Sequence, residues 1–243
     1  MRAMALVLAA GLLLWSCGSG LRATERTRVM QRILPSTVQL KAEREGGARR
    51  AASGVVVAAD VPTGRSWILT TRHFLDPPSR QEISLSNREH KGRFRAEVLA
   101  ASTDLDLAVI EVAGLSLPPV TLKELTRLGD EVWVAAYPWG RRLTVVSGVI
   151  SQLVGEEGDV ALEGIPRMVD ASVSYGASGG GVFDADSGSL VAIVEGYRTA
   201  QVVLPQSPGQ VLQMPVPGET TVIGARMIVR FLEASGLQRL IPK

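Results

Sequence analysis

The sequence predicts an all-β protein assembled from two groups of strands. From Pro35 onward, short apolar runs alternate with turns, which is the pattern of a β-sandwich or a β-barrel. A segment at residues 114–123, which contains Pro118-Pro119, separates the two groups. Helical patterns occur only before the first strand and after the last one.

The predicted strands are short and fall on either side of that segment. The first group lies at residues 37–41, 53–58, 67–70, 94–100 and 107–112. The second lies at residues 131–136, 143–153, 167–171, 181–183, 190–194 and 211–214, with 201–210 as a loop. Residues 41–50 are basic and predict a solvated hairpin, with a contact to RNA or anionic lipid as the alternative.

Two helices are predicted at the ends of the strand region. Residues 18–33 are interpreted as a polar tether that runs into a short helix, which Pro35 ends. A closing helix is expected at residues 223–235, because Ile228, Phe231 and Leu232 share one face of it. Gly236 is its predicted C-cap.

The composition excludes several classes of protein. The 243 residues suffice for one large all-β domain, or two small ones, with a substantial core. The net charge of +2 indicates no nucleic-acid-binding face. A single cysteine excludes a disulfide framework, and with only two histidines, far apart, neither a metal site nor a cofactor is expected.

The most informative stretch surrounds Ser178. Three glycines follow it at residues 179–181, and Gly176 precedes it by two positions. Glycine at this density indicates unusual backbone conformations or a close approach of the backbone to another group. Such a turn can present the serine hydroxyl while nearby N–H groups stabilise an oxyanion. On this motif alone, a plain glycine-rich loop between two strands is the alternative.

Two further stretches supply the groups that an activated serine requires. His73 follows an apolar run at residues 67–70, and Asp106 begins another at residues 107–112. The serine needs a base to take its proton, and the base needs an acid to fix its tautomer. The order His73, Asp106, Ser178 excludes an α/β-hydrolase, in which the histidine comes last, and it also differs from the subtilisin order.

Three blocks of sequence resemble the signature blocks of trypsin-like (chymotrypsin-type) serine peptidases, nearest the bacterial periplasmic Htr/Deg branch: Leu69-Thr70-x-x-His73, Asp106-Leu107-Ala108-Val109 and Gly176-x-Ser178-Gly179-Gly180. The resemblance implies a two-barrel peptidase domain at residues 34–240, with barrels at residues 34–117 and 124–222. The peptide-binding PDZ module that many members of that branch carry is not expected after the closing helix.

The resemblance also implies a function, which is that of an envelope serine endopeptidase acting on proteins or peptides. Ser178 would be the nucleophile, His73 the base and Asp106 the residue that orients the base. The backbone N–H groups of Gly176 and Ser178 would form the oxyanion hole. The wall of the specificity pocket would include Ser172, Val194, Glu195 and Gly196.

Three positions depart from the pattern of that family. Gly181 stands where proline is usual, Ala177 where aspartate or asparagine is frequent, and Arg72 where a small or amide side chain precedes the histidine. None of them removes a catalytic group, yet they leave open a catalytically silent domain that acts as an envelope binding module. Glu195 either favours a basic substrate side chain or points to solvent. A purely structural envelope lipoprotein leaves the ordered triad unexplained.

The first 17 residues have the pattern of an export signal. Arg2 precedes an apolar stretch from Ala3 to Leu14, which is too short to span a membrane. Leu14-x-Ser16-Cys17 resembles a bacterial lipoprotein processing site and implies lipid attachment at Cys17. The protein is therefore expected to be anchored in the cell envelope, facing the periplasm. Cleavage further along the chain, to give an ordinary secreted protein, is the alternative.

Overall fold

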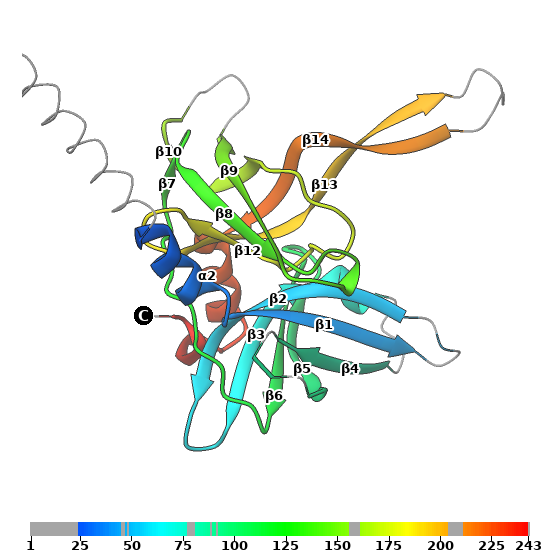
Figure 1. The fold of residues 1–243 in the computed structure, drawn as a ribbon, viewed down its shortest axis with the longest axis vertical. Helices are drawn as coiled ribbons and strands as arrows, with labels where there is room; N and C mark the ends of the chain where they lie inside the picture. Colours follow the sequence, from blue (N-terminus) through cyan, green and yellow to red (C-terminus); the bar gives the residue numbers. More distant parts are fainter. Residues whose placement is uncertain are drawn as a thin grey trace, which may run out of the picture.

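The computed structural model describes residues 24–44, 47, 49–76, 81–87, 89–90, 92–155, 161–203 and 211–242. These residues form two closed antiparallel barrels that lie one above the other in Figure 1. The strand order is β1-β2-β3-β6-β5-β4 in the first barrel and β11-β14-β13-β12-β8-β9 in the second. The prediction of an all-β, two-barrel fold is confirmed.

The first barrel comprises β1 (Thr37–Arg44), β2 (Arg49–Asp60), β3 (Arg65–Thr71), β4 (Gln81–Ser86), β5 (Phe94–Ser102) and β6 (Leu107–Ala113). Its interior holds fully buried aliphatic side chains such as Leu40, Ile68 and Ile110. The sequence did not predict β4, although Ile83 and Leu85 of that strand are buried at alternate positions.

The second barrel comprises β8 (Glu131–Ala136), β9 (Thr144–Leu153), β11 (Pro166–Asp170), β12 (Gly181–Asp184), β13 (Leu190–Val203) and β14 (Val211–Gly224). Two further short strands, β7 (Thr126–Arg127) and β10 (Glu163–Gly164), pair with each other beside it. Its interior is again aliphatic and includes Val134, Ile150 and Val194.

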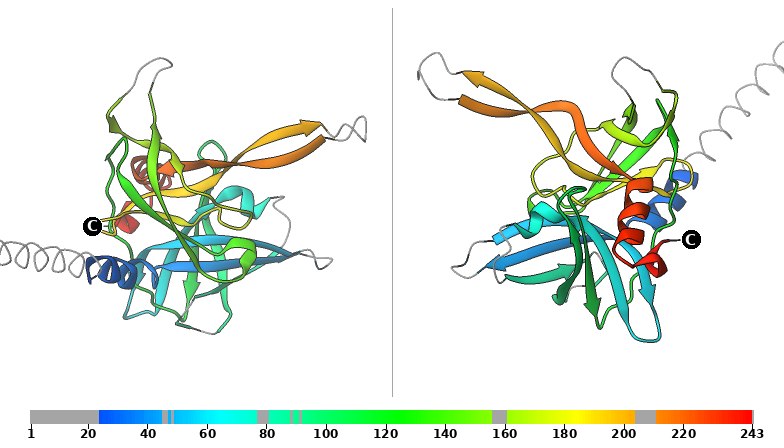
Figure 2. Two further views of the ribbon diagram at one scale, coloured as in Figure 1. Left: turned by 45° about the horizontal axis from the view of Figure 1, so that its top comes forward. Right: turned by 180° about the vertical axis from the view of Figure 1, so that it is seen from behind.

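The strands β13 and β14 are much longer than the sequence predicts. Their outer halves leave the barrel as a two-stranded ribbon that projects from the body of the molecule (Figures 1 and 2). Residues 201–203, predicted as part of a loop, instead continue β13 and pair with β14. Residues 204–210, the rest of that predicted loop, lie outside the described residues.

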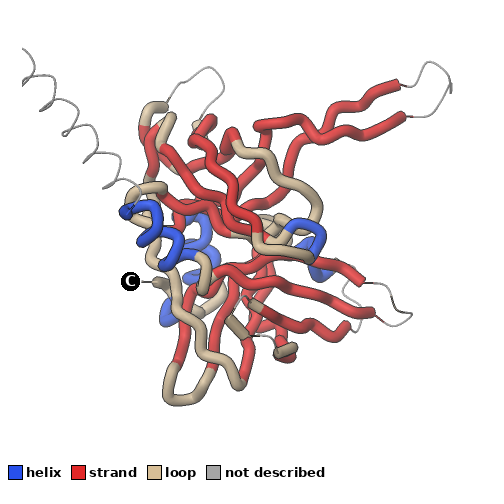
Figure 3. Tube along the Cα trace, viewed as in Figure 1, coloured by secondary structure: helices blue, strands red, loops and turns tan. Residues whose placement is uncertain are grey.

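Two helices lie on the same side of the molecule, next to the junction of the barrels (Figure 3). One covers residues 24–33, and the other is α2 (Ala225–Ala234), which begins two residues later than predicted because β14 extends to Gly224. Both insert apolar side chains into a single cluster, among them Ile33 and Phe231. That cluster also contains residues of both barrels and so joins them. No helix among the described residues is long and apolar enough to cross a membrane.

Three short 3₁₀ helices complete the described part of the chain: η1 (Arg72–Leu75), η2 (Pro138–Gly140) and η3 (Gln238–Leu240). The first two belong to the candidate site. Gly236, which follows Ser235 at the end of α2, has a φ of +70°, and the Leu237 N–H bonds the Leu232 carbonyl at 2.8 Å. This is the predicted glycine cap of the closing helix.

Candidate active site

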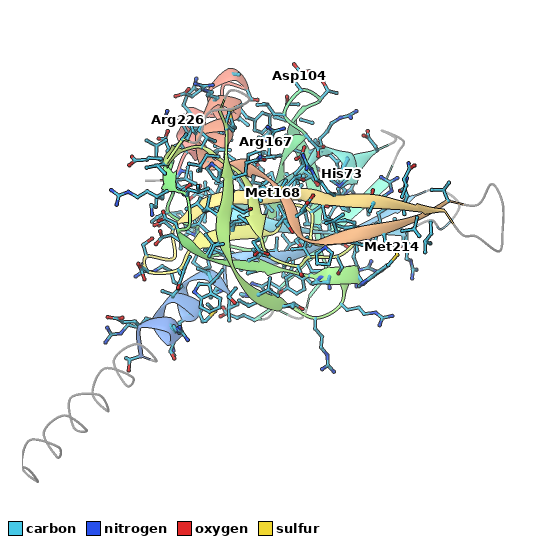
Figure 4. All side chains as sticks on the ribbon, turned by 90° about the horizontal axis from the view of Figure 1, so that it is seen from above. His73, Asp104, Arg167, Met168, Met214 and Arg226 are labelled. Carbon is cyan, nitrogen blue, oxygen red and sulfur yellow. The ribbon has the colours of Figure 1, made fainter. Side chains whose placement is uncertain are left out.

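His73 and Asp106 form a pair at one end of the first barrel. His73 lies in η1, which follows β3 (Figure 4), and Asp106 ends the turn before β6, the neighbour of β3. The Asp106 carboxylate lies 2.7 Å from the His73 Nδ1 through Oδ2, and its Oδ1 accepts the His73 backbone N–H at 2.8 Å. Both oxygens of the carboxylate therefore hold the histidine.

This arrangement determines which nitrogen of His73 can act as a base. A carboxylate can only accept hydrogen bonds, so the proton of the neutral imidazole belongs on Nδ1, where it is donated to Asp106. The other nitrogen, Nε2, then has a free lone pair. The side chain of His73 is 48% exposed, which leaves that nitrogen open to a substrate or a nucleophile.

The backbone around the pair is fixed as closely as the side chains. Asp106 has a φ of +49°, a conformation that aspartate tolerates better than most residues, and its carbonyl accepts the Arg72 N–H at 2.9 Å. The Arg72 side chain, one of the departures noted in the sequence, pairs with Asp76 at 2.8 Å. Arg50 donates from Nη1 to the His73 carbonyl at 2.9 Å.

The loop around Ser178 has four consecutive carbonyls that all accept hydrogen bonds. The Tyr175 carbonyl accepts from the Trp139 N–H at 2.7 Å, and the Ala177 carbonyl accepts from the Gly180 N–H at 2.8 Å. The carbonyls of Gly176 and Ser178 accept at 2.8 Å each from the hydroxyl and the N–H of one residue, Ser53. The peptide planes on both sides of the serine are therefore held.

The directions of two N–H groups follow from these bonds. In a planar trans peptide the N–H points away from the carbonyl of the preceding residue. Because the carbonyls of Tyr175 and Ala177 are held, the N–H groups of Gly176 and Ser178 point the other way. Among the residues that the structure describes, neither N–H has an acceptor. An oxyanion hole requires unpaired donors of this kind, and its formation by these two N–H groups stays a prediction.

Glycine is required at positions 176 and 179, because both have a positive φ and a Cβ at either would meet nearby backbone. Gly176 has a φ of +87° in a turn closed by the Ala177 N–H and the Ser174 carbonyl at 3.0 Å. Gly179 has a φ of +81°, and a Cβ there would lie 2.2 Å from the Ser53 carbonyl oxygen. The same Cβ would lie 2.5 Å from the Thr70 Oγ1, so the backbone after Ser178 packs directly on the first barrel.

The structure brings Ser178 to the first barrel but does not bond it to His73. Gly179, the next residue, packs on Thr70, which precedes His73 by three positions. Within the described part of the chain there is no hydrogen bond between the Ser178 hydroxyl and His73. Catalytic hydrogen bonds are often long before substrate binds, so the absence of this bond does not by itself exclude the pair. The triad as a whole stays a prediction.

The predicted pocket residues flank the serine loop in the sequence. The Val194 backbone pairs with it, since its carbonyl accepts from Gly179 and its N–H bonds Gly180, at 2.8 Å each. Glu195 and Gly196 follow in β13 and are half-buried, whereas Ser172 is exposed. An exposed aromatic pair, Trp139 and Tyr175, stands beside the Gly176 turn with ring centroids 5.3 Å apart. Their roles as a pocket stay predicted.

Other residues singled out in the sequence lie elsewhere. His90 is exposed, and its Nδ1 lies 3.2 Å from the Asn87 Oδ1. Across the described ranges, no group of three or more His, Cys, Asp or Glu side chains is arranged to hold a metal ion. Cys17 lies outside the described residues.

Sequence reasoning missed two contributors to this site. Ser53 was included in a strand but given no role, although a serine between alanine and glycine in an apolar run is a signal of a buried polar contact. Trp139 was assigned to a turn, and its φ of +57°, which directs its N–H to Tyr175, has no signal in the sequence.

The His–Asp pair lies on the first barrel, and the loop of the glycine-flanked serine packs against that barrel from the second. This is the architecture of two-barrel serine peptidases. A family model described as a trypsin-like peptidase domain matches residues 52–193. The match covers more than half of the 243 residues. The chain belongs to this family.

Known relatives are larger proteins. A probable periplasmic serine endoprotease, DegP-like, of Halomonas elongata is 30% identical over 154 residues, which cover 60% of this chain and 29% of that protein. The periplasmic serine endoprotease DegP of Escherichia coli K12 is 27% identical over 146 residues, 58% of this chain and 29% of that protein. The chain thus spans less than a third of the length of these two relatives.

Solved structures share the fold at lower identity. A serine endoprotease of Yersinia pestis superposes with a TM-score of 0.65 at 22% identity, covering 88% of this chain and 66% of that one. An inactive form of Rv3671c from M. tuberculosis gives 0.63 at 20% identity, with 86% and 91% covered. Both agree with the two-barrel arrangement seen here.

Proposed function

We propose that this protein is a serine endopeptidase of the cell envelope that hydrolyses peptide bonds through an acyl-enzyme. The observation that carries the proposal is the His73–Asp106 pair, with both carboxylate oxygens engaged, together with the N–H groups of Gly176 and Ser178, which have no acceptor among the described residues. Membership of the trypsin-like peptidase family supports it, as do relatives named as serine endoproteases.

The proposed reaction follows from these groups. The Ser178 Oγ attacks the carbonyl carbon of the scissile peptide while the His73 Nε2 takes its proton. The oxyanion that forms is stabilised by the N–H groups of Gly176 and Ser178, and loss of one such donor typically lowers kcat by about 10²–10³. The intermediate collapses when His73 returns the proton to the leaving amine. Water then repeats the sequence and releases the acyl group from Ser178.

The substrate is proposed to be an extended stretch of polypeptide. Its reactive residue would lie against β13 at Val194, Glu195 and Gly196, with Ser172 on the other side of the serine loop. Val194 is already paired with that loop through two hydrogen bonds, so a substrate held along the adjoining residues lies next to the Ser178 hydroxyl. Ser172 offers no charge, which leaves Glu195 as the residue that would favour a basic side chain.

The location is proposed from the N-terminus of the sequence. The relatives named above are periplasmic proteins, and the apolar stretch that ends at Cys17 supports export and lipid attachment. Several acyl chains on one residue hold a protein firmly at a membrane, whereas one chain holds it only marginally. Mass spectrometry of the mature N-terminus tests this: an unmodified start beyond Cys17 would indicate a secreted protein.

Labelling with a serine-reactive fluorophosphonate tests the activity. The wild-type protein is expected to be labelled, Ser178→Ala not at all, and His73→Ala very weakly, because the two residues act as one unit. His90→Ala serves as the control and should be labelled like the wild type. The missing hydrogen bond between Ser178 and His73 favours a second candidate, a catalytically silent binding domain, and an unlabelled wild type would support it.

A further inference from the structure

Ser53 is a fully buried polar residue of the first barrel. It lies in β2, opposite Gln39 of β1, in a run that is otherwise alanine, glycine and valine. A buried hydroxyl needs partners, because an unpaired one destabilises the fold. Among the described residues, the partners of the Ser53 hydroxyl belong to the second barrel.

Both donors of Ser53 reach the serine loop of the second barrel. The Ser53 hydroxyl donates to the Gly176 carbonyl at 2.8 Å, and the Ser53 N–H donates to the Ser178 carbonyl at 2.8 Å. These two carbonyls belong to the same residues whose N–H groups form the proposed oxyanion hole. From the opposite barrel, Ser53 therefore fixes the peptide planes that follow Gly176 and Ser178.

The same hydroxyl also holds the segment that orients Gly176 from its other side. It accepts the Tyr137 N–H at 2.8 Å, two residues before Trp139, whose N–H binds the Tyr175 carbonyl. The carbonyls of Tyr175 and Gly176 belong to the peptide planes on either side of the Gly176 Cα. Because both carbonyls are held, neither backbone torsion of Gly176 is free. Glycine has the widest choice of torsions of any residue, so this turn depends most on such support.

We propose that Ser53 is a positioning residue for the oxyanion hole, an inference that rests on the proposed function. Its hydroxyl keeps the Gly176 N–H directed at the place where the oxyanion forms, and it does not touch the substrate. Removal of the hydroxyl takes away its bonds to the Gly176 carbonyl and the Tyr137 N–H, so the turn is held less firmly. The loss falls on the transition state, because the ground-state carbonyl depends less on these donors.

The first barrel contains a matched control. Ser66 is also fully buried, in β3, at the opposite end of that strand from His73. Its hydroxyl donates to the Leu115 carbonyl at 2.8 Å and accepts the Leu117 N–H at 2.9 Å. Ser66→Ala therefore removes one donated and one accepted bond, as Ser53→Ala does, but away from the site.

The test compares Ser53→Ala with Ser66→Ala in steady-state hydrolysis of a peptide ester or amide. We expect Ser53→Ala to lower kcat by about tenfold to a hundredfold with KM within about twofold of the wild type. Ser66→Ala should stay within about threefold in kcat, although both variants lower Tm. Equal losses of kcat in the two variants, or a loss confined to KM, would overturn the proposal.

Hydrogen exchange of the backbone amides gives a readout that needs no activity. Ser53→Ala should accelerate exchange in residues 174–180, and Ser66→Ala should not. Unchanged exchange in Ser53→Ala overturns the proposal. If the wild type shows no hydrolysis but Ser53→Ala still exchanges faster, the contact between Ser53 and the serine loop is supported. Only the proposed function is then lost.

A second variant covers the case in which Ser53→Ala does not fold. Thr70→Val keeps the shape of the side chain but removes the bond from the Thr70 Oγ1 to the Ser53 carbonyl, which is 2.8 Å long. It should lower kcat by a few fold and accelerate exchange in the same loop. A wild-type kcat together with wild-type exchange in this variant would count against the role of Ser53.

Discussion

The two halves of the β13–β14 hairpin are built on different principles. At the base, Leu190, Ile193 and Val194 are fully buried, and the Val194 backbone pairs with the serine loop. In the outer half, the large apolar side chains are exposed: Val202 is 40% exposed, Leu212 47% and Met214 48%. Figure 4 shows Met214 out on the projecting ribbon.

The difference separates the part of the hairpin that supports chemistry from the part that is held only by strand pairing. The base belongs to the cores of the barrel and of the barrel junction, so its side chains fix the position of Gly179 and Gly180. The outer half has backbone pairing between β13 and β14 but no buried face among the described residues. The following substitutions test whether the two halves contribute as differently as this implies.

The largest effect is expected at the contact between the base of the hairpin and the serine loop. Gly179→Ala should lower the free energy of unfolding by about 4–5 kcal/mol, because it adds left-handed strain and a clash with the backbone of Ser53. Labelling of Ser178 should also be lost. Chemical denaturation and fluorophosphonate labelling measure the two effects.

Gly129→Ala is the matched control for this substitution. Gly129 has a similar φ of +86°, but a Cβ there would meet no atom within 4 Å. It should lose only the strain of the left-handed conformation, about 1–2 kcal/mol. Equal destabilisation by the two substitutions would show that the close approach at Gly179 is unimportant.

The second effect concerns the buried side chains of the base. Ile193 is fully buried in the cluster that joins the two barrels and pairs with Gly181 and Ile223. Ile193→Ala should lower the free energy of unfolding by about 3 kcal/mol, through lost burial and the cavity left behind. The measurement is urea denaturation followed by tryptophan fluorescence. A loss under about 1 kcal/mol would mean that the base is not the anchor.

The sequence predicted the base of the hairpin better than its outer half, and the reason is physical. Residues 190–194 form a continuous apolar run because both faces of β13 are buried there, and a buried strand leaves that signature. Beyond Gly196 no face is buried, so the sequence has no alternation to detect. The strand continues only because β14 pairs with it, and pairing by itself leaves no pattern of hydrophobicity.

The same contrast applies to the site. His73, Asp106 and Ser178 were predicted because their chemistry requires particular residue types in a particular order. Ser53 acts through its backbone groups and its hydroxyl. The bond from that hydroxyl to the Gly176 carbonyl joins residues 123 positions apart. Such a role becomes apparent only once the barrels are packed together.

A third effect is expected at the salt bridge that links the crossing segment to β12, the strand that pairs with the base of the hairpin. The Lys123 Nζ bonds the Asp184 carboxylate in β12 and lies 3.5 Å from Asp130. Burial by itself raises the pKa of Asp184, but the bonds from Lys123 and Ser187 outweigh it and bring that pKa below its ordinary value. Burial lowers the pKa of Lys123, yet Asp184 and Asp130 raise it overall.

The pH dependence follows from these directions. A carboxyl group whose pKa is lower in the folded protein stabilises the fold at pH values above the pKa that this group has in the unfolded chain. The stabilisation is lost as pH falls through the pKa of the group in the folded protein. The raised lysine pKa stabilises the fold until pH rises through the folded lysine value. Asp184→Asn should therefore lower the free energy of unfolding by about 2 kcal/mol near neutral pH. The difference should shrink as pH falls below about 3.9, the ordinary pKa of an aspartate, and a difference that stays the same at acid pH would contradict the assignment.

The smallest effect is expected in the outer half of the ribbon. Leu212 pairs with Val202 across the two strands, but its side chain is 47% exposed and contributes to no buried cluster. Leu212→Ala should change the free energy of unfolding by less than about 0.5 kcal/mol. It should also leave kcat for a short peptide unchanged, because the bonds that hold the serine loop come from the base of the hairpin, Ser53 and Trp139. Denaturation and steady-state kinetics on the same preparation test both expectations. If Leu212→Ala lost as much stability as Ile193→Ala, its side chain would have to be packed in solution, and the division of the hairpin into a buried base and an unpacked outer half would be wrong.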